Sequence, residues 1–314
     1  MPRTAIKISV VGVGFVGSTI AYTLMMKGVA SEIVLVDVNQ RRAEGEAMDI
    51  AHGAPFAAAA TVRAGSYEDT AGSDLVIITA GTNQKPGETR MDLITRNSAI
   101  MKDCAENVAK NSPNALLLIV SNPVDVMSYV AWQVSGFPRE RVIGSGTVLD
   151  SARFRYLLSL AFKIDPRNIH GYILGEHGDS EFPAWSLVNI AGMDIDEASH
   201  AFGDRFTAQH RADIAAATRN AAYEIIDRKG ATYYGIGMSA ARIAEAIVRD
   251  EQSIMSVSTL LNGEYGIDDV FLSVPTIVGE GGVVRVLTPE LAPDEIGELV
   301  KSAGLLKQAR QQLG

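Results

Sequence analysis

Short apolar runs alternate with amphipathic segments along the first half of the chain. The runs are rich in Val, Ile and Leu and lie at 5–11, 32–38, 60–64, 74–80, 115–121 and 141–145. Helical patterns separate most of them, at 18–28, 41–51, 90–110 and 124–135. Continuous apolar strands joined by helices are typical of a parallel sheet that is covered on both faces. We therefore predict a doubly wound parallel α/β sheet for residues 1–145.

The second half of the chain has a different pattern. It contains a glycine-rich segment of expected strands and turns at 257–287, and helical patterns at 151–162, 213–230, 239–250 and 292–313. In the last helix we expect one apolar face, made by Ile296, Leu299, Val300 and Ala303. We therefore predict a second, mixed α+β catalytic domain for residues 146–314.

The composition indicates a soluble globular protein. Of the 314 residues, 47% are hydrophobic and 21% are charged, and the formal net charge is −9. Such an acidic chain is a poor partner for nucleic acid, because neutralising phosphates requires a basic surface. The strongest apolar run, 115–120, is far shorter than the roughly 20 residues that span a membrane.

A single cysteine and the N-terminal pattern give the expected location. Cys104 is the only cysteine, which excludes an intrachain disulfide and a cysteine-based metal site. The N-terminus runs directly into a strand pattern without a targeting segment. We predict a cytoplasmic protein without a metal, in which Cys104 is a buried, unreactive thiol.

A glycine pattern directly after the first strand indicates a dinucleotide site. Gly12, Gly14 and Gly17 have the G-x-G-x-x-G spacing, which gives a tight turn, close approach of a pyrophosphate and close helix packing. Alone, the pattern is also explained by structural glycines. Asp37 ends the second strand 20 residues after Gly17, where a carboxylate binds ribose hydroxyls and repels a 2′-phosphate. The unit therefore predicts a Rossmann domain that prefers NAD to NADP.

Three further segments carry groups suited to hydride transfer to a 2-oxo acid. That reaction needs a proton donor, a cation that polarises the carbonyl and a cation that holds the carboxylate. His177 in GEHGDS is the candidate donor, and Arg90 lies in a glycine-rich segment after a strand end. Asp150 and Arg153 are three residues apart in a helical pattern, so both can face one site. Taken singly, each group also has a plain explanation as a loop residue, a solvated charge or a surface ion pair.

Together, and in this order, these motifs closely resemble the L-lactate/malate dehydrogenase family, and within it the bacterial lactate enzymes. The resemblance extends over essentially the whole chain. It implies that His177 is the general acid/base and that Asp150 holds its other ring nitrogen. It also implies that Arg153 binds the substrate carboxylate, while Arg90 polarises the carbonyl from a closing loop. The residues alone leave Glu176 and Asp179 open as partners of His177, and only the resemblance selects Asp150.

The resemblance also implies the remaining contacts of the site. For the substrate pocket it adds Asn122 and Thr232. The expected cofactor contacts are Gly12, Gly14, Val16, Gly17, Asp37, Arg42, Tyr67, Gly81, Thr82, Asn122 and Ser145. Arg42 is a possible neighbour of the pyrophosphate or a solvated helix charge.

Gln84 separates lactate from malate chemistry. Malate enzymes of the family present an arginine at this position, which meets the second carboxylate of their substrate. A neutral amide would leave that carboxylate unpaired in a closed pocket, at a cost of several kcal/mol. Pyruvate and L-lactate are therefore the expected substrates. The alternatives are a malate dehydrogenase, another L-2-hydroxy acid dehydrogenase, or a non-catalytic NAD-binding protein.

Two basic residues match a regulatory site of the allosteric bacterial enzymes. Arg155 and His170 correspond to residues that bind fructose 1,6-bisphosphate at a subunit interface. Without the resemblance they are a surface helix arginine and a histidine at a strand start. The resemblance implies activation by the sugar bisphosphate and a homo-oligomer, expected to be a tetramer that the bound anion stabilises by linkage.

Overall fold

The computed structural model describes residues 5–82, 87, 90–203 and 206–312. Within this part, one sheet of eight strands runs through the molecule, in the order β13-β12-β6-β5-β4-β1-β2-β3. Its parallel strands are β1 (Lys7–Val11), β2 (Glu32–Val36), β3 (Thr61–Ala64), β4 (Leu75–Ile78), β5 (Leu116–Ile119) and β6 (Val142–Gly144). The order of these six strands is that of a Rossmann fold, so the predicted doubly wound sheet is confirmed.

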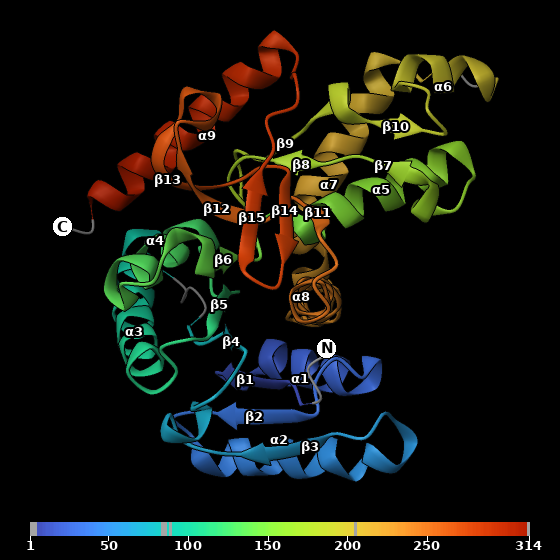
Figure 1. Cartoon of the computed structure of the whole chain (residues 1–314). Helices are drawn as coiled ribbons and strands as arrows, with labels where there is room; N and C mark the ends of the chain where they lie inside the picture. Colours follow the sequence, from blue (N-terminus) through green and yellow to red (C-terminus); the bar gives the residue numbers. More distant parts are fainter. Residues whose placement is uncertain (1–4, 83–86, 88–89, 204–205, 313–314) are drawn as a thin grey trace.

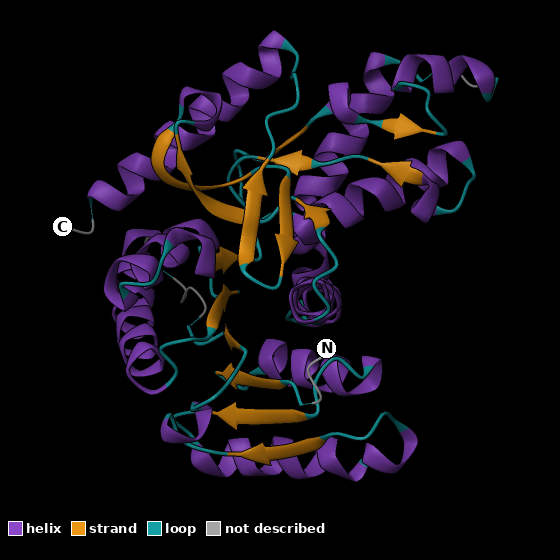
Figure 2. Ribbon diagram, viewed as in Figure 1, coloured by secondary structure: helices purple, strands orange, loops and turns teal. Residues whose placement is uncertain are grey.

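Alternate residues of the strands feed two separate cores, one on each face of the sheet. On one face, Ile8 and Val10 of β1 join a core with α1 (Phe15–Lys27), α2 (Gln40–His52) and α8 (Tyr234–Val248). On the other, Val11 joins a core with α3 (Arg90–Asn111) and α4 (Val124–Ser135). Figure 2 shows helices flanking the strands of this sheet. Burial on both faces explains why the strands are continuous apolar runs rather than alternating ones.

The second half of the chain both extends this sheet and builds a further layer. An antiparallel hairpin, β12 (Ser258–Asn262) and β13 (Asp268–Ser273), joins the sheet where Ser258 pairs with Gly144 of β6. Helix α8 lies end-on in Figure 1 between α1 and the small sheet of β11, β14 and β15. The predicted boundary at residue 145 follows β6 directly, yet the sheet continues across it.

A third core lies around Phe154, Leu158 and Ile173, and the remaining elements contribute to it or to the two cores described above. The helices are α5 (Val148–Phe162), α6 (Ile195–Ala201), α7 (Ala208–Lys229) and α9 (Pro293–Gln311). The short strands are β7 (Ile169–His170), β8 (Ile173–Leu174), β9 (Phe182–Pro183), β10 (Asn189–Ile190), β11 (Ser253–Met255), β14 (Thr276–Gly279) and β15 (Gly282–Val286). This half is therefore mixed α+β, as predicted. In the described part of the chain, no helix has both the length and the apolar character needed to cross a membrane.

The predicted apolar face of the closing helix α9 is wrong in part. Leu299 and Ala303 are buried, but Ile296 and Val300 keep 40% and 50% of their surface exposed. The buried stripe runs through Leu299, Ser302 and Leu306, and the other two residues lie toward solvent on its flank. The pattern of apolar residues placed the buried face of α9 incorrectly, because Ser302 is buried although it is polar.

This correction predicts a difference between two neighbouring truncations. Leu299→Ala removes a fully buried side chain and should lower the free energy of unfolding by about 2–5 kcal/mol. Val300→Ala removes a half-exposed one and should cost less than about 1 kcal/mol. Urea unfolding of both variants tests this; equal losses would show that α9 presents the face expected from its sequence.

Candidate active site

The glycine turn after β1 is built by close backbone contacts. Gly12 has φ +90°, and a Cβ there would lie 2.6 Å from the Ala80 nitrogen. A Cβ at Gly17 would overlap the Gly12 carbonyl oxygen. Both positions therefore require glycine for the fold itself, because neighbouring backbone leaves no room for a side chain.

Gly14 and Asp37 complete a site that fits a dinucleotide. Gly14 caps α1 without a side-chain hydrogen bond, and a Cβ there would meet no atom within 4 Å, so the helix N-terminus is open to an anion. The Asp37 carboxylate accepts hydrogen bonds from the backbone of Val13 and of Asn39, both at 2.8 Å. It is thereby fixed beside the turn, where a ribose would follow a pyrophosphate.

Four other expected cofactor residues, Val16, Arg42, Ser145 and Tyr67, lie on separate elements of the fold. Val16 is half-buried in the first turn of α1, and the Arg42 guanidinium lies 6.0 Å from the Phe15 ring centroid at the start of α1. Ser145 follows β6 and is buried. Tyr67 donates its hydroxyl to Cys104 at 3.3 Å, and burial raises the pKa of that thiol to about 11. Cys104 is therefore buried, as predicted, and its thiol is protonated at neutral pH.

Asn97 is a residue of the site that sequence reasoning missed. It is buried on α3, and its Oδ1 accepts from the Thr82 backbone nitrogen at 2.9 Å. Its Nδ2 donates to the backbone oxygens of Thr82, at 3.1 Å, and Asn122, at 2.9 Å. One amide thus joins the segments that follow β4 and β5, and it also lies beside Gly81. No spacing rule signals such a contact, because an asparagine in a helix is usually solvated.

The His177 imidazole is bound to Asp150, as the resemblance implied. Asp150 lies in the first turn of α5, and its Oδ2 is 2.7 Å from His177 Nδ1. Its other oxygen accepts from Arg153 Nη1 at 2.6 Å. Glu176 and Asp179, the alternatives left open, bond instead to the hydroxyls of Ser180 and Tyr223.

These contacts determine the charge of the imidazole. Burial opposes the imidazolium, but the charge of Asp150 and its hydrogen bond outweigh burial, and the pKa of His177 is raised to about 9. Burial also opposes ionisation of Asp150, yet His177 and Arg153 together lower its pKa. The result is a carboxylate–imidazolium pair at neutral pH. The His177 side chain remains 28% exposed, so its outer edge is accessible.

A second buried carboxylate holds the backbone of the histidine loop. Asp125 on α4 accepts from the His177 backbone nitrogen at 2.8 Å and from Ser258 Oγ at 2.6 Å. Burial raises the pKa of Asp125 to about 6. The loop between β8 and β9 is therefore fixed to the central sheet, and the imidazole is fixed to α5.

A cavity of about 370 Å³ opens in front of this group. His177, Asp150, Arg153 and Asn122 line it, together with residues of α3 and α7 that include Leu93, Ile94, Ala222 and Ile226. Thr232 is half-buried in the segment between α7 and α8 and does not line this cavity. Gln84 lies outside the described residues. Arg90 is the first residue of α3, and its side chain is likewise outside the description.

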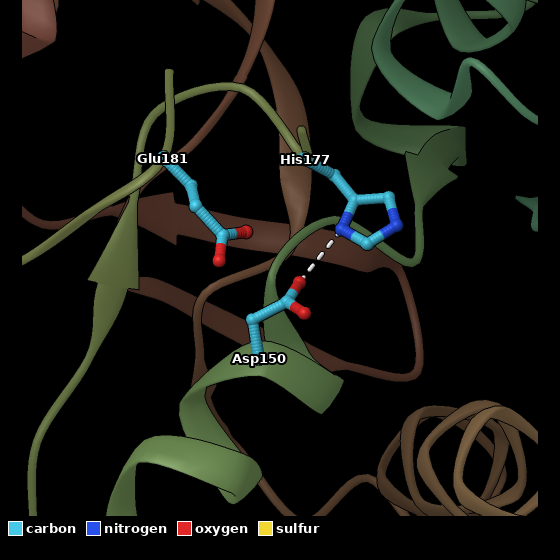
Figure 3. A group of neighbouring side chains, drawn as sticks. All are labelled: Asp150, His177 and Glu181. Atoms are coloured by element: carbon cyan, nitrogen blue, oxygen red, sulfur yellow. Dashed lines mark hydrogen bonds and ion pairs between the residues drawn. The ribbon is translucent and has the colours of Figure 1, made fainter. Parts of the chain in front are cut away.

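Glu181 and Arg219 also line the cavity and were missed. Figure 3 shows the Glu181 carboxylate beside Asp150 and His177; one ligand-type atom of each lies within 4.8 Å of the others. A nitrogen and two carboxylates at this spacing have the donors of a cation site. The Arg153 guanidinium already bonded to Asp150 disfavours a further cation there, so the arrangement is better suited to proton transfer.

Arg155 and His170 line a separate cavity of about 280 Å³. Burial lowers the pKa of Arg155, so its guanidinium is partly desolvated. Arg242, a third basic residue that sequence reasoning missed, lines the same cavity. It is bonded to Ser253 and Glu251, and its Nη1 has no partner in the described part of the chain. The two sequence-predicted residues are therefore together, in a basic hollow.

Comparisons with known proteins agree along the whole chain. Residues 6–144 match the family described as lactate/malate dehydrogenase, NAD binding domain, and 147–313 match its alpha/beta C-terminal domain. The L-lactate dehydrogenase 1 of Clostridium acetobutylicum is 55% identical over 303 residues, 96% of this chain and 97% of that protein. The L-lactate dehydrogenase of a Thermoanaerobacter species is 52% identical over 307 residues, 98% and 99% of the two chains.

Solved structures give the same result for the fold. The minor L-lactate dehydrogenase of Enterococcus mundtii in its ligands-bound form has a TM-score of 0.96 at 45% identity, covering 99% of each chain. Its ligands-unbound form has a TM-score of 0.91 at 44% identity, covering 100% of this chain and 99% of that one.

The two glycines give a prediction that separates folding from cofactor binding. Gly14→Ala fits the fold but places a methyl group where the cofactor phosphates approach, so it should weaken NADH binding at least about tenfold with little change in stability. Gly17→Ala should lower the free energy of unfolding by several kcal/mol, because its Cβ meets backbone.

NADH fluorescence titration and urea unfolding of both variants provide the test. A loss of stability in Gly14→Ala, with binding unchanged, would contradict the assignment of this turn to the cofactor.

Proposed function

The chain belongs to the lactate/malate dehydrogenase family, and we propose that it catalyses the reversible reduction of pyruvate to L-lactate by NADH. Family membership makes it an NAD-dependent oxidoreductase. The observation that supports this reaction best is the Asp150–His177 pair with Arg153 beside it, on a cavity that Asn122 also lines. The two relatives from Clostridium acetobutylicum and Thermoanaerobacter carry the name L-lactate dehydrogenase, which supports the choice of substrate.

The chain supplies the proton and the charges for this reaction, while bound NADH supplies the hydride. His177, protonated at neutral pH, donates from Nε2 to the oxygen that becomes the lactate hydroxyl. Asp150 holds Nδ1, which fixes the ring and stabilises the imidazolium. Arg153 binds the substrate carboxylate in the cavity, and Arg90 has the position in the chain of the residue that polarises the carbonyl. In lactate oxidation, neutral His177 accepts the proton.

The preference for pyruvate rests on Gln84. An oxaloacetate molecule bound by Arg153 would bring a second carboxylate toward that amide, with no cation to pair it. Pyruvate presents a methyl group there instead. A neutral amide at this position therefore favours pyruvate over oxaloacetate, because burying an unpaired charge costs far more free energy than leaving an apolar contact unfilled.

The first experiment follows NADH oxidation with pyruvate and with oxaloacetate. Wild type should prefer pyruvate, and Gln84→Arg should shift the ratio of kcat/KM values toward oxaloacetate by at least about a hundredfold. Gln209→Arg, which adds the same charge at an exposed position on α7, is the matched control. An unchanged ratio in Gln84→Arg would contradict the specificity argument, and no activity with either substrate would contradict the proposed reaction.

We extend the proposal to a regulatory anion at the Arg155–His170 cavity. The hollow is lined by three basic residues, Arg155, His170 and Arg242, and the Arg155 guanidinium is partly desolvated. Such a hollow suits the phosphates of fructose 1,6-bisphosphate. Ile254, which lines the hollow, is an exposed apolar side chain. Such surfaces favour association with further copies of the chain, in a tetramer that the anion stabilises.

This site predicts a loss of activation without a loss of catalysis. Arg155→Ala combined with His170→Ala should abolish the response of pyruvate reduction to the bisphosphate while leaving turnover at saturating pyruvate within about threefold. Light scattering with and without the bisphosphate reports the assembly. Arg167→Ala combined with His52→Ala, at exposed positions that do not line the hollow, is the control. Activation that persists in the first double variant would place the effector elsewhere.

A further inference from the structure

Glu181 is a buried carboxylate that the mechanism above does not use. Only 5% of the residue is exposed, and it lines the substrate cavity beside Asp150 and His177 (Figure 3). Its backbone is held, since its nitrogen donates to the Gly178 oxygen and its oxygen accepts from Arg219 at 3.0 Å. Within the described residues, no group donates a hydrogen bond to its carboxylate. The backbone contacts therefore fix the residue, while the acid group faces the site.

The surroundings of this carboxylate carry charges of both signs. Those around the site are Asp125, Asp150, Arg153, Glu176, His177, Asp179 and Arg219, with Glu298 and Lys301 of α9 on the adjoining cavity. Burial and the charge of Asp150 raise the pKa of Glu181 to about 8, although His177, Arg153 and Arg219 oppose this rise. Glu181 is therefore largely a neutral acid at pH 7.

We propose that Glu181 is a positioning residue whose neutral form admits the substrate carboxylate to the cavity, and whose ionised form excludes it. The inference rests on the proposed function, since it concerns a 2-oxo or 2-hydroxy acid bound by Arg153. Ionised Glu181 adds a negative charge beside Asp150, in the cavity where a second anion has to enter. Ionised Glu181 therefore weakens binding of the substrate carboxylate and leaves the hydride-transfer step unaffected.

The pH dependence of lactate oxidation distinguishes the effect of Glu181 from that of His177. Loss of a proton from His177 favours the reaction, whereas loss of a proton from Glu181 opposes it. Neutral His177 is needed to accept the proton, so its titration makes kcat/KM for lactate rise with pH. Ionisation of Glu181 makes lactate binding weaker over the same range. If only the neutral form binds, a group that titrates near pH 8 raises KM about tenfold between about pH 7 and about pH 9. The expected signature is a KM that rises with pH as Glu181 ionises, together with a kcat that rises as His177 loses its proton.

The test compares wild type with Glu181→Gln in lactate oxidation at saturating NAD. The isosteric amide is neutral at every pH, so the alkaline rise in KM should disappear. The pH at which kcat/KM rises should also move lower, because the Glu181 charge helps to hold the proton on His177. Glu176→Gln removes another buried carboxylate of the same loop, which bonds to Ser180, and should keep the alkaline rise. An active Glu181→Gln enzyme with the wild-type profile would overturn the proposal.

A second measurement needs no variant. Oxamate, an unreactive analogue of pyruvate, is titrated calorimetrically into the wild-type NADH complex near pH 8, in buffers of different ionisation enthalpy. Glu181 should take up a substantial fraction of a proton there, with a smaller share from His177. Uptake that increases only as His177 titrates, at higher pH, would overturn the proposal. A protein that neither binds oxamate nor turns over lactate would contradict the proposed function instead.

Discussion

The bond between the Asp150 carboxylate and the His177 imidazole is the interaction on which the active site depends. It joins α5 to the loop between β8 and β9, two segments that both line the cavity. A buried carboxylate is stable in this position only because His177 and Arg153 both neutralise it. The same pairing keeps the imidazole protonated at neutral pH, so the position of His177 and its charge both depend on this contact.

The charges of the site are balanced rather than simply positive. In the proposed reaction, Arg153 and the imidazolium attract an anionic substrate, whereas Asp150 and Asp125 hold the histidine in place. Glu181 adds a group whose charge changes just above neutral pH. A cavity with so many ionisable groups at close range responds steeply to pH, because each proton alters the affinity of its neighbours. The substrate carboxylate is one more member of that set.

Local patterns predicted the framework of this site, while its supporting contacts came from the fold. The glycine spacing and Asp37 were visible because a strand, a turn and a helix N-terminus are contiguous in sequence. The bond of His177 to Asp150, by contrast, was selected only by family resemblance, since Glu176 and Asp179 are nearer in the chain. Asn97, Asp125 and Glu181 gave no signal at all. Each acts through partners far away in sequence, and a polar residue gains its role from being buried beside them.

The most direct test of this account is the titration of His177 by NMR in wild type and in Asp150→Asn. We expect the imidazole of wild type to titrate near pH 9, because the carboxylate outweighs the effect of burial. In the variant the pKa should fall by at least about two units, since burial then acts with little opposition. Equal pKa values in the two proteins would contradict the claim that Asp150 controls the charge of His177.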